Sequence, residues 1–248
     1  MFTYNGIDFS QLVKVQDVRR PILAPQKLST VSIEGRHGSY FYRKVSDSVT
    51  IEIDIAVVAD SPNELRTKIR DLAEKLDAEE PKPLIIHDEP DKYINVIISD
   101  NTDLEGLYYF GKATIKFFAP DPFWYAVDDD IFEFTTTGVK NFTRKGNADS
   151  YPRIEIKGTC NNGGFTIITD NTTMTFTGTL LQGEKLVLDS DLLTAYIVKT
   201  DGSTVSAIKD LDNLDFPVFV KGANSINVVP NGGATLESYK VYCNSRWK

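Results

Sequence analysis

One short stretch divides this sequence into two parts: Phe117-Phe118-Ala119-Pro120-Asp121-Pro122-Phe123-Trp124-Tyr125. Before it, residues 107–118 alternate between apolar and polar types, which predicts a β-strand ending at Phe118. Pro120 and Pro122 lack the backbone N–H that a sheet ladder needs, and each favours an extended conformation in the preceding residue. The bulky Phe123 and Trp124 follow at once. We therefore predict a domain junction anchored by Pro120, Pro122, Phe123 and Trp124.

The composition indicates a soluble globular protein of one large or two ordinary domains. The chain has 248 residues, 41% of them hydrophobic and 25% charged. No apolar run approaches the roughly 20 residues that span a bilayer, and the first residues do not have the pattern of a signal peptide. A net charge of −8 argues against a protein that holds nucleic acid through its phosphates. Cys160 and Cys243 are expected to be free, buried thiols.

The first part of the chain, residues 1–125, predicts a β domain with one packed helix. Asn5-Gly6 is a strong hairpin signal, and residues 49–57 alternate as a half-buried strand. Ser61 and Glu64 form a capping box with a proline at the first helical position, so we predict a helix over about 61–77. Its apolar stripe consists of Leu65, Ile69, Leu72, Ala73 and Leu76.

The second part predicts strands only. Short apolar runs alternate with turns rich in glycine and asparagine, which is typical of a β-sandwich or jelly roll over residues 151–248. Residues 126–150 are expected to form a linker, in which Asp128, Asp129 and Asp130 stay in water.

No set of residues predicts catalysis, and we expect no enzyme, metal site or cofactor. His37 and His87 are the histidines, and they fall on different loops without a third ligand at a metal-like spacing. The segment from Gly35 to Gly38 precedes a strand and not a helix, so it lacks the helix N-terminus of a phosphate loop.

The order of several individually weak motifs is more informative than any one of them. These motifs are Phe2-x-Tyr4-Asn5-Gly6, Gly35-Arg36-x-Gly38, Leu72-Ala73-x-x-Leu76, Phe117-x-x-Pro120-Asp121-Pro122-Phe123, Tyr151-Pro152-x-Ile154 and Leu181-x-Gly183-Glu184. Together they resemble the distal tail proteins of long-tailed bacteriophages (siphophages and prophages) of Gram-positive bacteria.

The resemblance implies a structural protein of the phage tail tip or baseplate, made in the host cytoplasm. It implies a hexameric ring of first domains with a channel for DNA in transit, and a galectin-like or carbohydrate-binding-module-like second domain. The implied neighbours are the tail-tube protein, the tape-measure protein, the tail-associated lysin or fibre base, and in some phages a receptor-binding protein. The alternative is a carbohydrate-binding adhesin module of a phage or cell surface.

A hairpin over residues 31–44 is the candidate ring interface, with Gly35, Arg36, Gly38, Tyr40, Phe41 and Tyr42 as its proposed contact residues. Successive residues of a strand point to opposite faces, so the Phe41 side chain is expected to point away from the face that carries Tyr40 and Tyr42. One core cannot cover both faces, whereas a neighbouring copy can. The other interpretation is an ordinary surface hairpin whose aromatics cover the local core.

Overall fold

The computed structural model describes residues 1–99, 105–107, 110–161 and 163–248. The chain forms two compact units, Met1–Val127 with Lys248, and Asp128–Trp247. Each unit has a hydrophobic core of its own. The boundary therefore lies two residues beyond the predicted end of the first domain.

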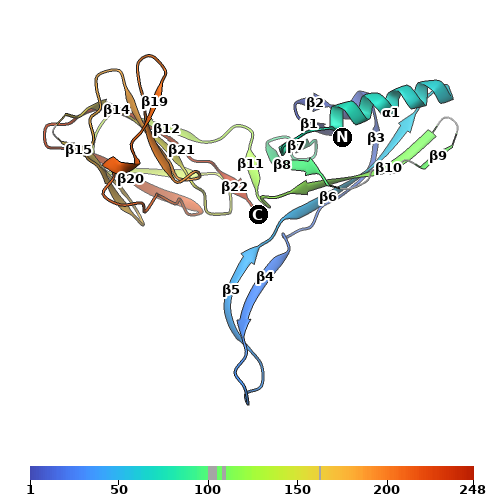
Figure 1. The fold of residues 1–248 in the computed structure, drawn as a ribbon, viewed down its shortest axis with the longest axis horizontal. Coiled ribbons are helices and arrows are strands. Elements are labelled where there is room, and N and C mark those ends of the chain that lie inside the picture. The colour runs from blue at the N-terminus through green and yellow to red at the C-terminus, as the bar shows by residue number, and fades with distance from the viewer. Residues whose placement is uncertain (100–104, 108–109, 162) are drawn as a thin grey trace. The chain divides into compact units, whose positions relative to one another are not determined.

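The first unit is built on an antiparallel sheet with the strand order β2-β1-β7-β8-β10-β6-β3 (Figure 1). β9 pairs with one end of β10, and β11 pairs with β8. The predicted strand over 107–118 corresponds mainly to β10; Leu107 belongs to β9, and Tyr108 and Tyr109 lie outside the described residues. The strands are β1 (Phe2–Tyr4), β2 (Ile7–Asp8), β3 (Lys14–Arg19), β6 (Val49–Val58), β7 (Lys82–Ile86), β8 (Lys92–Ile98), β9 (Glu105–Leu107), β10 (Phe110–Ala119) and β11 (Trp124–Ala126).

The predicted hairpin at the N-terminus is present. Asn5 and Gly6 have φ values of 51° and 76°, the left-handed conformations that a tight turn between twisted strands requires. The turn places Phe2 on β1 near Phe9, which begins a short 3-10 helix (Phe9–Gln11), and the two rings stack with their centroids 4.9 Å apart. Phe2 and Phe9 thus both belong to the first core.

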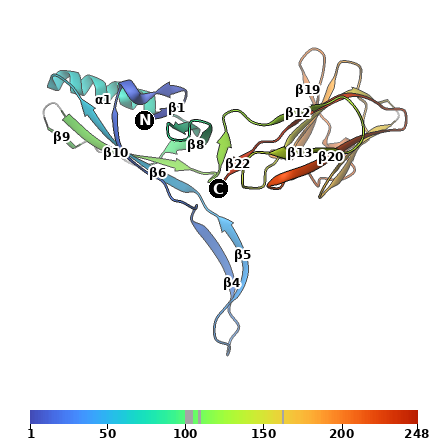
Figure 2. The same ribbon diagram turned by 180° about the vertical axis from the view of Figure 1, so that it is seen from behind.

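One helix, α1 (Pro62–Leu76), covers one face of this sheet (Figure 2). Ser61 caps it as predicted, because its hydroxyl accepts a 3.2 Å hydrogen bond from the Glu64 N–H. The Glu64 carboxylate accepts a 2.8 Å bond from the N–H of Asp60. Leu65, Leu72 and Leu76 are buried, but Ile69 is half-buried and Ala73 is exposed. The apolar stripe of the helix is therefore wider than the core that covers it.

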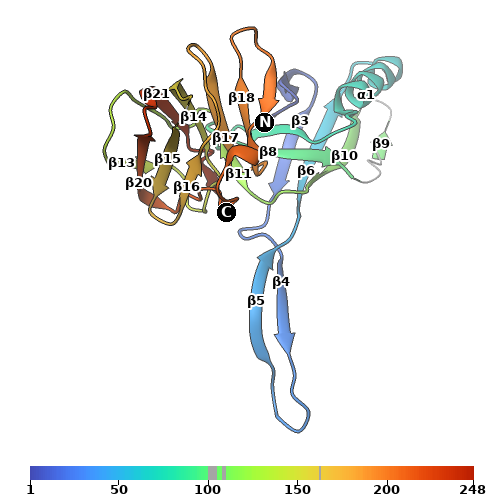
Figure 3. The ribbon, with the colours of Figure 1, turned by 60° about the vertical axis from the view of Figure 1, so that its left-hand side comes forward.

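The hairpin of residues 26–46, called the arm below, extends away from this sheet (Figures 1 and 3). It consists of β4 (Gln26–Val31) and β5 (Tyr40–Ser46), which form a separate two-stranded sheet. The arm is inserted between β3 and β6, two paired strands of the body.

The second unit is a sandwich of two antiparallel sheets, as predicted, with the strand orders β12-β21-β14-β17-β18-β19 and β13-β20-β15-β16. Apolar side chains of both sheets form the second core. A short 3-10 helix occupies Ile208–Asp210. The strands are β12 (Ile131–Phe134), β13 (Lys140–Arg144), β14 (Arg153–Thr159), β15 (Gly164–Thr169), β16 (Thr173–Phe176), β17 (Lys185–Asp189), β18 (Thr194–Val198), β19 (Thr204–Ser206), β20 (Gly222–Asn231), β21 (Thr235–Tyr242) and β22 (Arg246–Trp247).

The prediction that residues 126–150 form a linker is wrong. β12 pairs with β21 and β13 pairs with β20, so this segment supplies a strand to each sheet of the sandwich. Asp129 accepts a 3.0 Å hydrogen bond from the Ser245 N–H, and Asp130 accepts one of 2.6 Å from the Lys145 N–H. These two aspartates are half-buried turn residues and do not form a solvated crossing.

A buried arginine holds several loops of the second unit together. Arg144 is only 3% exposed, and burial lowers the pKa of its guanidinium. Arg144 donates hydrogen bonds to the carbonyl oxygens of Val220 at 2.9 Å, Phe219 at 3.0 Å and Lys145 at 2.8 Å, and also to that of Ala148. The charge is thus solvated by backbone dipoles.

We predict that Arg144→Met lowers the free energy of unfolding by about 3 kcal/mol, because it leaves several buried carbonyls without donors. Urea titration followed by circular dichroism measures this. Lys221→Met, at an exposed position of the same unit, is the matched control and should change the stability by less than about 0.5 kcal/mol. Equal stability of the two variants would contradict the structural role of Arg144.

Both cysteines are free and buried, as expected. The Cys160 thiol lies 3.1 Å from the carbonyl oxygen of Gly178. Burial, reinforced by the nearby Asp129 and Asp130, raises the pKa of Cys243 to about 12. Since the thiolate is the reactive form, Cys243 is protonated and inert at neutral pH.

We predict that the native chain reacts slowly with a thiol reagent such as dithionitrobenzoate at pH 8. The rate should rise little between pH 7 and pH 9, because Cys243 stays protonated until near pH 12. In denaturant both thiols should react rapidly, because unfolding exposes them. A fast native reaction would show that the second core opens readily.

Candidate oligomerisation surface

The arm carries an unusual number of exposed apolar side chains. They are exposed to between 46% and 75%: Leu28, Val31, Ile33, Tyr40, Phe41, Tyr42 and Val45. A monomeric protein rarely exposes a contiguous apolar surface without a function for it. The interpretation in which these aromatics cover the local core is therefore wrong.

The register of the arm places apolar side chains on both of its faces. Phe41 pairs with Thr30, and Leu28, two residues before Thr30 on β4, lies on the same face of the arm as this pair. Tyr40 pairs with Val31, and this pair lies on the opposite face. The register shifts between Ser29 and Thr30, which twists the ribbon locally. Two strands have no interior, so neither face is buried by the arm itself.

The tip of the arm brings four of the predicted interface residues together. Gly35 and Gly38 have φ values of 79° and 85°, which favour glycine, and no atom would contact an added side chain at either position. The Arg36 guanidinium lies 4.9 Å from the ring centroid of Tyr40. The tip is thus compact and accessible.

The root of the arm is fixed to the body by a short network. The Asp47 N–H donates a 2.7 Å hydrogen bond to the Pro25 carbonyl, and Lys27 forms a 2.9 Å ion pair with the Asp47 carboxylate. The hydrogen bond from Lys27, followed by the one from the Ser48 N–H, lowers the pKa of Asp47. These bonds set the direction in which the arm leaves β3 and β6.

The arm also differs from the rest of the chain in charge. Lys27, Arg36, Arg43 and Lys44 stand against Glu34, a net charge of +3, whereas the whole chain carries −8. All four basic residues are exposed. A basic arm on an acidic protein favours an acidic partner surface.

The predicted junction residues end the first unit. Trp124 packs against the first core, and the Arg20 guanidinium lies 5.7 Å from the centroid of its ring. Tyr125 stacks on Tyr93 at 5.8 Å. Pro122, Phe123 and Trp124 are half-buried, and Pro120 is exposed. Trp124 and Tyr125 therefore hold this segment on the sheet of the first unit.

The two histidines lie apart. His37 is exposed at the arm tip, and the His87 Nε2 atom lies 3.4 Å from the Thr3 hydroxyl. Within the described ranges, no three His, Cys, Asp or Glu side chains gather closely enough to hold a metal ion. In the same part of the chain, no helix has the length and apolarity to cross a bilayer.

Residues 7–119 match the phage tail protein RIFT-related domain. The first unit is thus similar to a known phage tail domain. No curated protein matches the chain in sequence.

Solved structures extend the likeness to the whole chain. SPP1 Dit (gp 19.1), described as a paradigm of the hub adsorption apparatus in phages that infect Gram-positive bacteria, aligns with a TM-score of 0.80 at 18% identity, covering 100% of this chain and 98% of the other. Chains of the phage p2 baseplate in its activated conformation, with Sr or Ca, align with TM-scores of 0.54 and 0.53 at 11% identity. They cover 94% and 97% of this chain, and 91% and 92% of theirs. The predicted resemblance to distal tail proteins and the predicted mainly-β fold are confirmed.

The exposed apolar surface of the arm is larger than the sequence predicts. Leu28 and Val45 lie outside the predicted hairpin of residues 31–44 but are 61% and 49% exposed. The composition contained a usable signal, because residues 26–46 mix apolar and basic residues without the strict alternation of a half-buried strand.

We predict that trypsin cuts the dilute, unassembled protein first after Arg36, since the arm tip is exposed and lies outside the strands of the ladder. Mass spectrometry of the early fragments identifies the site. Arg36→Gln should delay the first cut while leaving later cuts unchanged. A first cut within the body in both variants would show that the tip is not accessible.

Proposed function

We propose that this chain is a structural subunit of a phage tail tip, forming a ring that joins the tail tube to the host-adsorption apparatus. The phage tail domain in the first unit and the fold shared with SPP1 Dit and phage p2 baseplate chains support this role. The observation that carries it is the arm, a two-stranded ribbon with exposed apolar side chains on both faces.

A ring follows from the position of the arm on one side of the unit. A surface that binds a different surface of the next copy makes a heterologous contact, and repeated heterologous contacts form a ring when the rotation between copies closes, or a filament when it does not. Within the described residues, β4 and β5 pair only with each other, so the arm offers a neighbouring copy two open strand edges as well as its exposed side chains. Six copies are the number that the family resemblance implies.

The channel of such a ring is proposed to be lined by the face of β3, β6 and β10 opposite α1. By register this face carries four basic residues (Lys14, Arg19, Lys112 and Lys116) and three acidic ones (Asp17, Glu52 and Asp54). Arg19 is neutralised by ion pairs with Glu52 at 3.1 Å and Asp54 at 2.9 Å. A nearly neutral wall suits DNA in transit, because it offers few cations for the phosphates.

The proposed partners are the tail-tube and tape-measure proteins on one side, and the tail-associated lysin or fibre base on the other. A receptor-binding protein is a further candidate. The proposed location is the virion tail tip, after synthesis in the bacterial cytoplasm.

A carbohydrate-binding module is the second candidate function. The second unit has a cavity of about 310 Å³ lined by Tyr151, Tyr242, Arg153 and carboxylates. However, the Arg153 guanidinium lies 4.4 Å from the Tyr242 ring centroid, and the Arg246 guanidinium lies 4.5 Å from that of Tyr151. Each ring thus has a cation over one face, where a sugar would otherwise stack. The hub is the better supported function.

We predict that Phe41→Asp leaves a folded monomer with an unchanged circular dichroism spectrum and abolishes six-fold rings. Negative-stain microscopy and light scattering of the purified chain measure this. Leu214→Asp is the matched control, because Leu214 is 63% exposed and Phe41 65%, but Leu214 lies in the second unit. Rings of Phe41→Asp, or its unfolding, would contradict a contact role for Phe41, and a wild type without rings would contradict the hub.

A further inference from the structure

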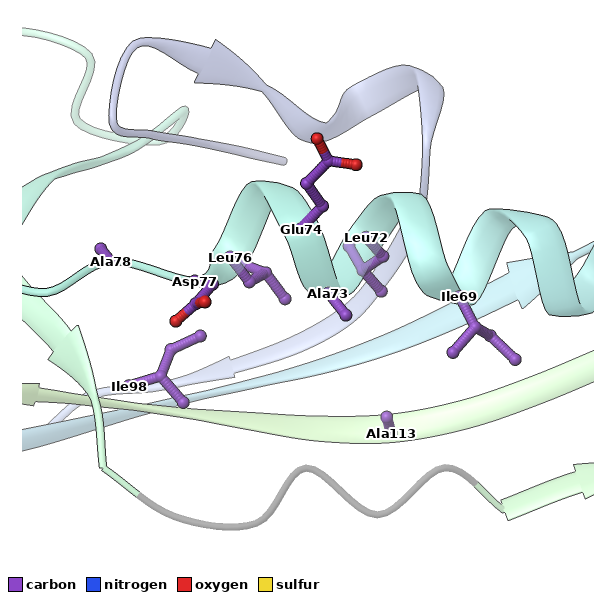
Figure 4. Close-up of a pocket in the computed structure, with 9 residues that line it drawn as sticks. All are labelled: Ile69, Leu72, Ala73, Glu74, Leu76, Asp77, Ala78, Ile98 and Ala113. Carbon is purple, nitrogen blue, oxygen red and sulfur yellow. The ribbon is translucent and has the colours of Figure 1, made fainter.

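The first unit contains a second incomplete surface, a groove of about 540 Å³ between α1 and the sheet (Figure 4). Its apolar lining includes Ile69 and Ala73 of α1, Ile98 of β8 and Ala113 of β10. Figure 4 shows the Ile69 and Ala73 side chains directed from the helix toward the strand that carries Ala113. This region is called the α1 groove below.

The α1 groove is where the helix stripe remains uncovered. Leu65, Leu72 and Leu76 are buried against the sheet, whereas Ile69 and Ile98 are half-buried and Ala73 is exposed. A helix with one apolar stripe normally has the whole stripe against a core. The groove therefore has the lining of a docking site for apolar side chains.

The rim of the α1 groove is acidic. Asp77 lies at its end close to Ile98 (Figure 4), and Glu79 and Glu80 follow directly along the chain. Glu80 is paired with Lys82 at 2.5 Å; for Asp77 and Glu79 no ion pair is found among the described residues. Outside the arm, residues 1–127 contain 11 basic and 19 acidic residues, a net charge of −8, against +3 in the arm.

We propose that the arm of one copy docks in the α1 groove of the neighbouring copy. This inference rests on the proposed ring and names the surface that receives the arm. The two surfaces complement one another, because each is apolar at its centre, one is basic and the other is acidic at the rim. Burial of Phe41 and Leu28 against Ile69 and Ala73 completes the stripe of α1.

The receiving groove belongs to a second copy and not to the same chain. The arm leaves the sheet at the ends of β3 and β6 and extends away from α1 of its own unit in Figures 1 and 3. Its root is fixed in that direction by the contacts of Asp47 with Pro25 and Lys27. A head-to-tail contact of arm and groove is heterologous, as a ring requires.

Cross-linking between differently labelled copies tests this pairing. Thr30→Cys shares a face of the arm with Phe41, Ser39→Cys lies near the tip, and Ala73→Cys lies in the groove. Each arm variant is assembled with the groove variant of the full chain and treated with a short bis-maleimide. The native thiols are buried and stay out of the reaction. Thr67→Cys, exposed on α1 outside the groove lining, is the matched control.

We expect at least one arm variant to give about tenfold more cross-linked dimer with Ala73→Cys than with Thr67→Cys, since docked neighbours react at a high effective concentration. Oligomers without a preference for Ala73 would overturn the groove assignment and leave the ring proposal standing. In a further variant that carries both Thr30→Cys and Ala73→Cys, cross-links formed only within one chain would also overturn it. The absence of any oligomer would overturn both proposals.

Discussion

A two-stranded ribbon has no interior, and this constraint governs what the arm can do. In a larger sheet, a second layer covers one face, as α1 covers the sheet of the first unit. The arm has no such layer in its own unit, yet Phe41, Leu28 and Tyr40 are apolar and exposed on its two faces. Burial of half of one such side chain stabilises by roughly 1 kcal/mol. An isolated hairpin is only marginally stable in water, so the proposed partner surface would stabilise the arm as well as the assembly.

Outside the arm, each unit is stabilised by contacts within the unit itself. Each unit has its own core, and ionic groups within the second unit, such as Arg144, are satisfied by backbone carbonyls of that unit. In the first unit, the ion pairs of Arg19 and Arg20 hold charged side chains near the base of the arm. Substitutions on the arm should therefore change association without loss of fold. The structure thus combines two separately packed units with an exposed arm, which is the proposed contact element.

Local signals predicted the fold well where one residue pattern decides the structure. Asn5-Gly6, the Ser61 cap and the alternation of β6 each act over a few residues and are present as expected. The linker prediction failed because Asp128, Asp129 and Asp130 suggest a solvated segment, whereas their turn is fixed by distant partners such as Ser245. The three consecutive aromatics predicted the arm, whereas no pattern in the sequence predicted the α1 groove. Whether Ile69 and Ala73 are covered depends on tertiary packing, which no helical periodicity reveals.

Hydrogen–deuterium exchange of the β4 and β5 amides, measured over a range of protein concentrations, tests most directly whether a neighbouring copy covers the arm. We expect slow exchange in concentrated, assembled protein and fast exchange on dilution. The amides of β6 and β10 should keep the same protection throughout, since their ladder belongs to the body. Equal protection of the arm at all concentrations, in protein that assembles, would contradict the account, because the arm would then be stable without a partner.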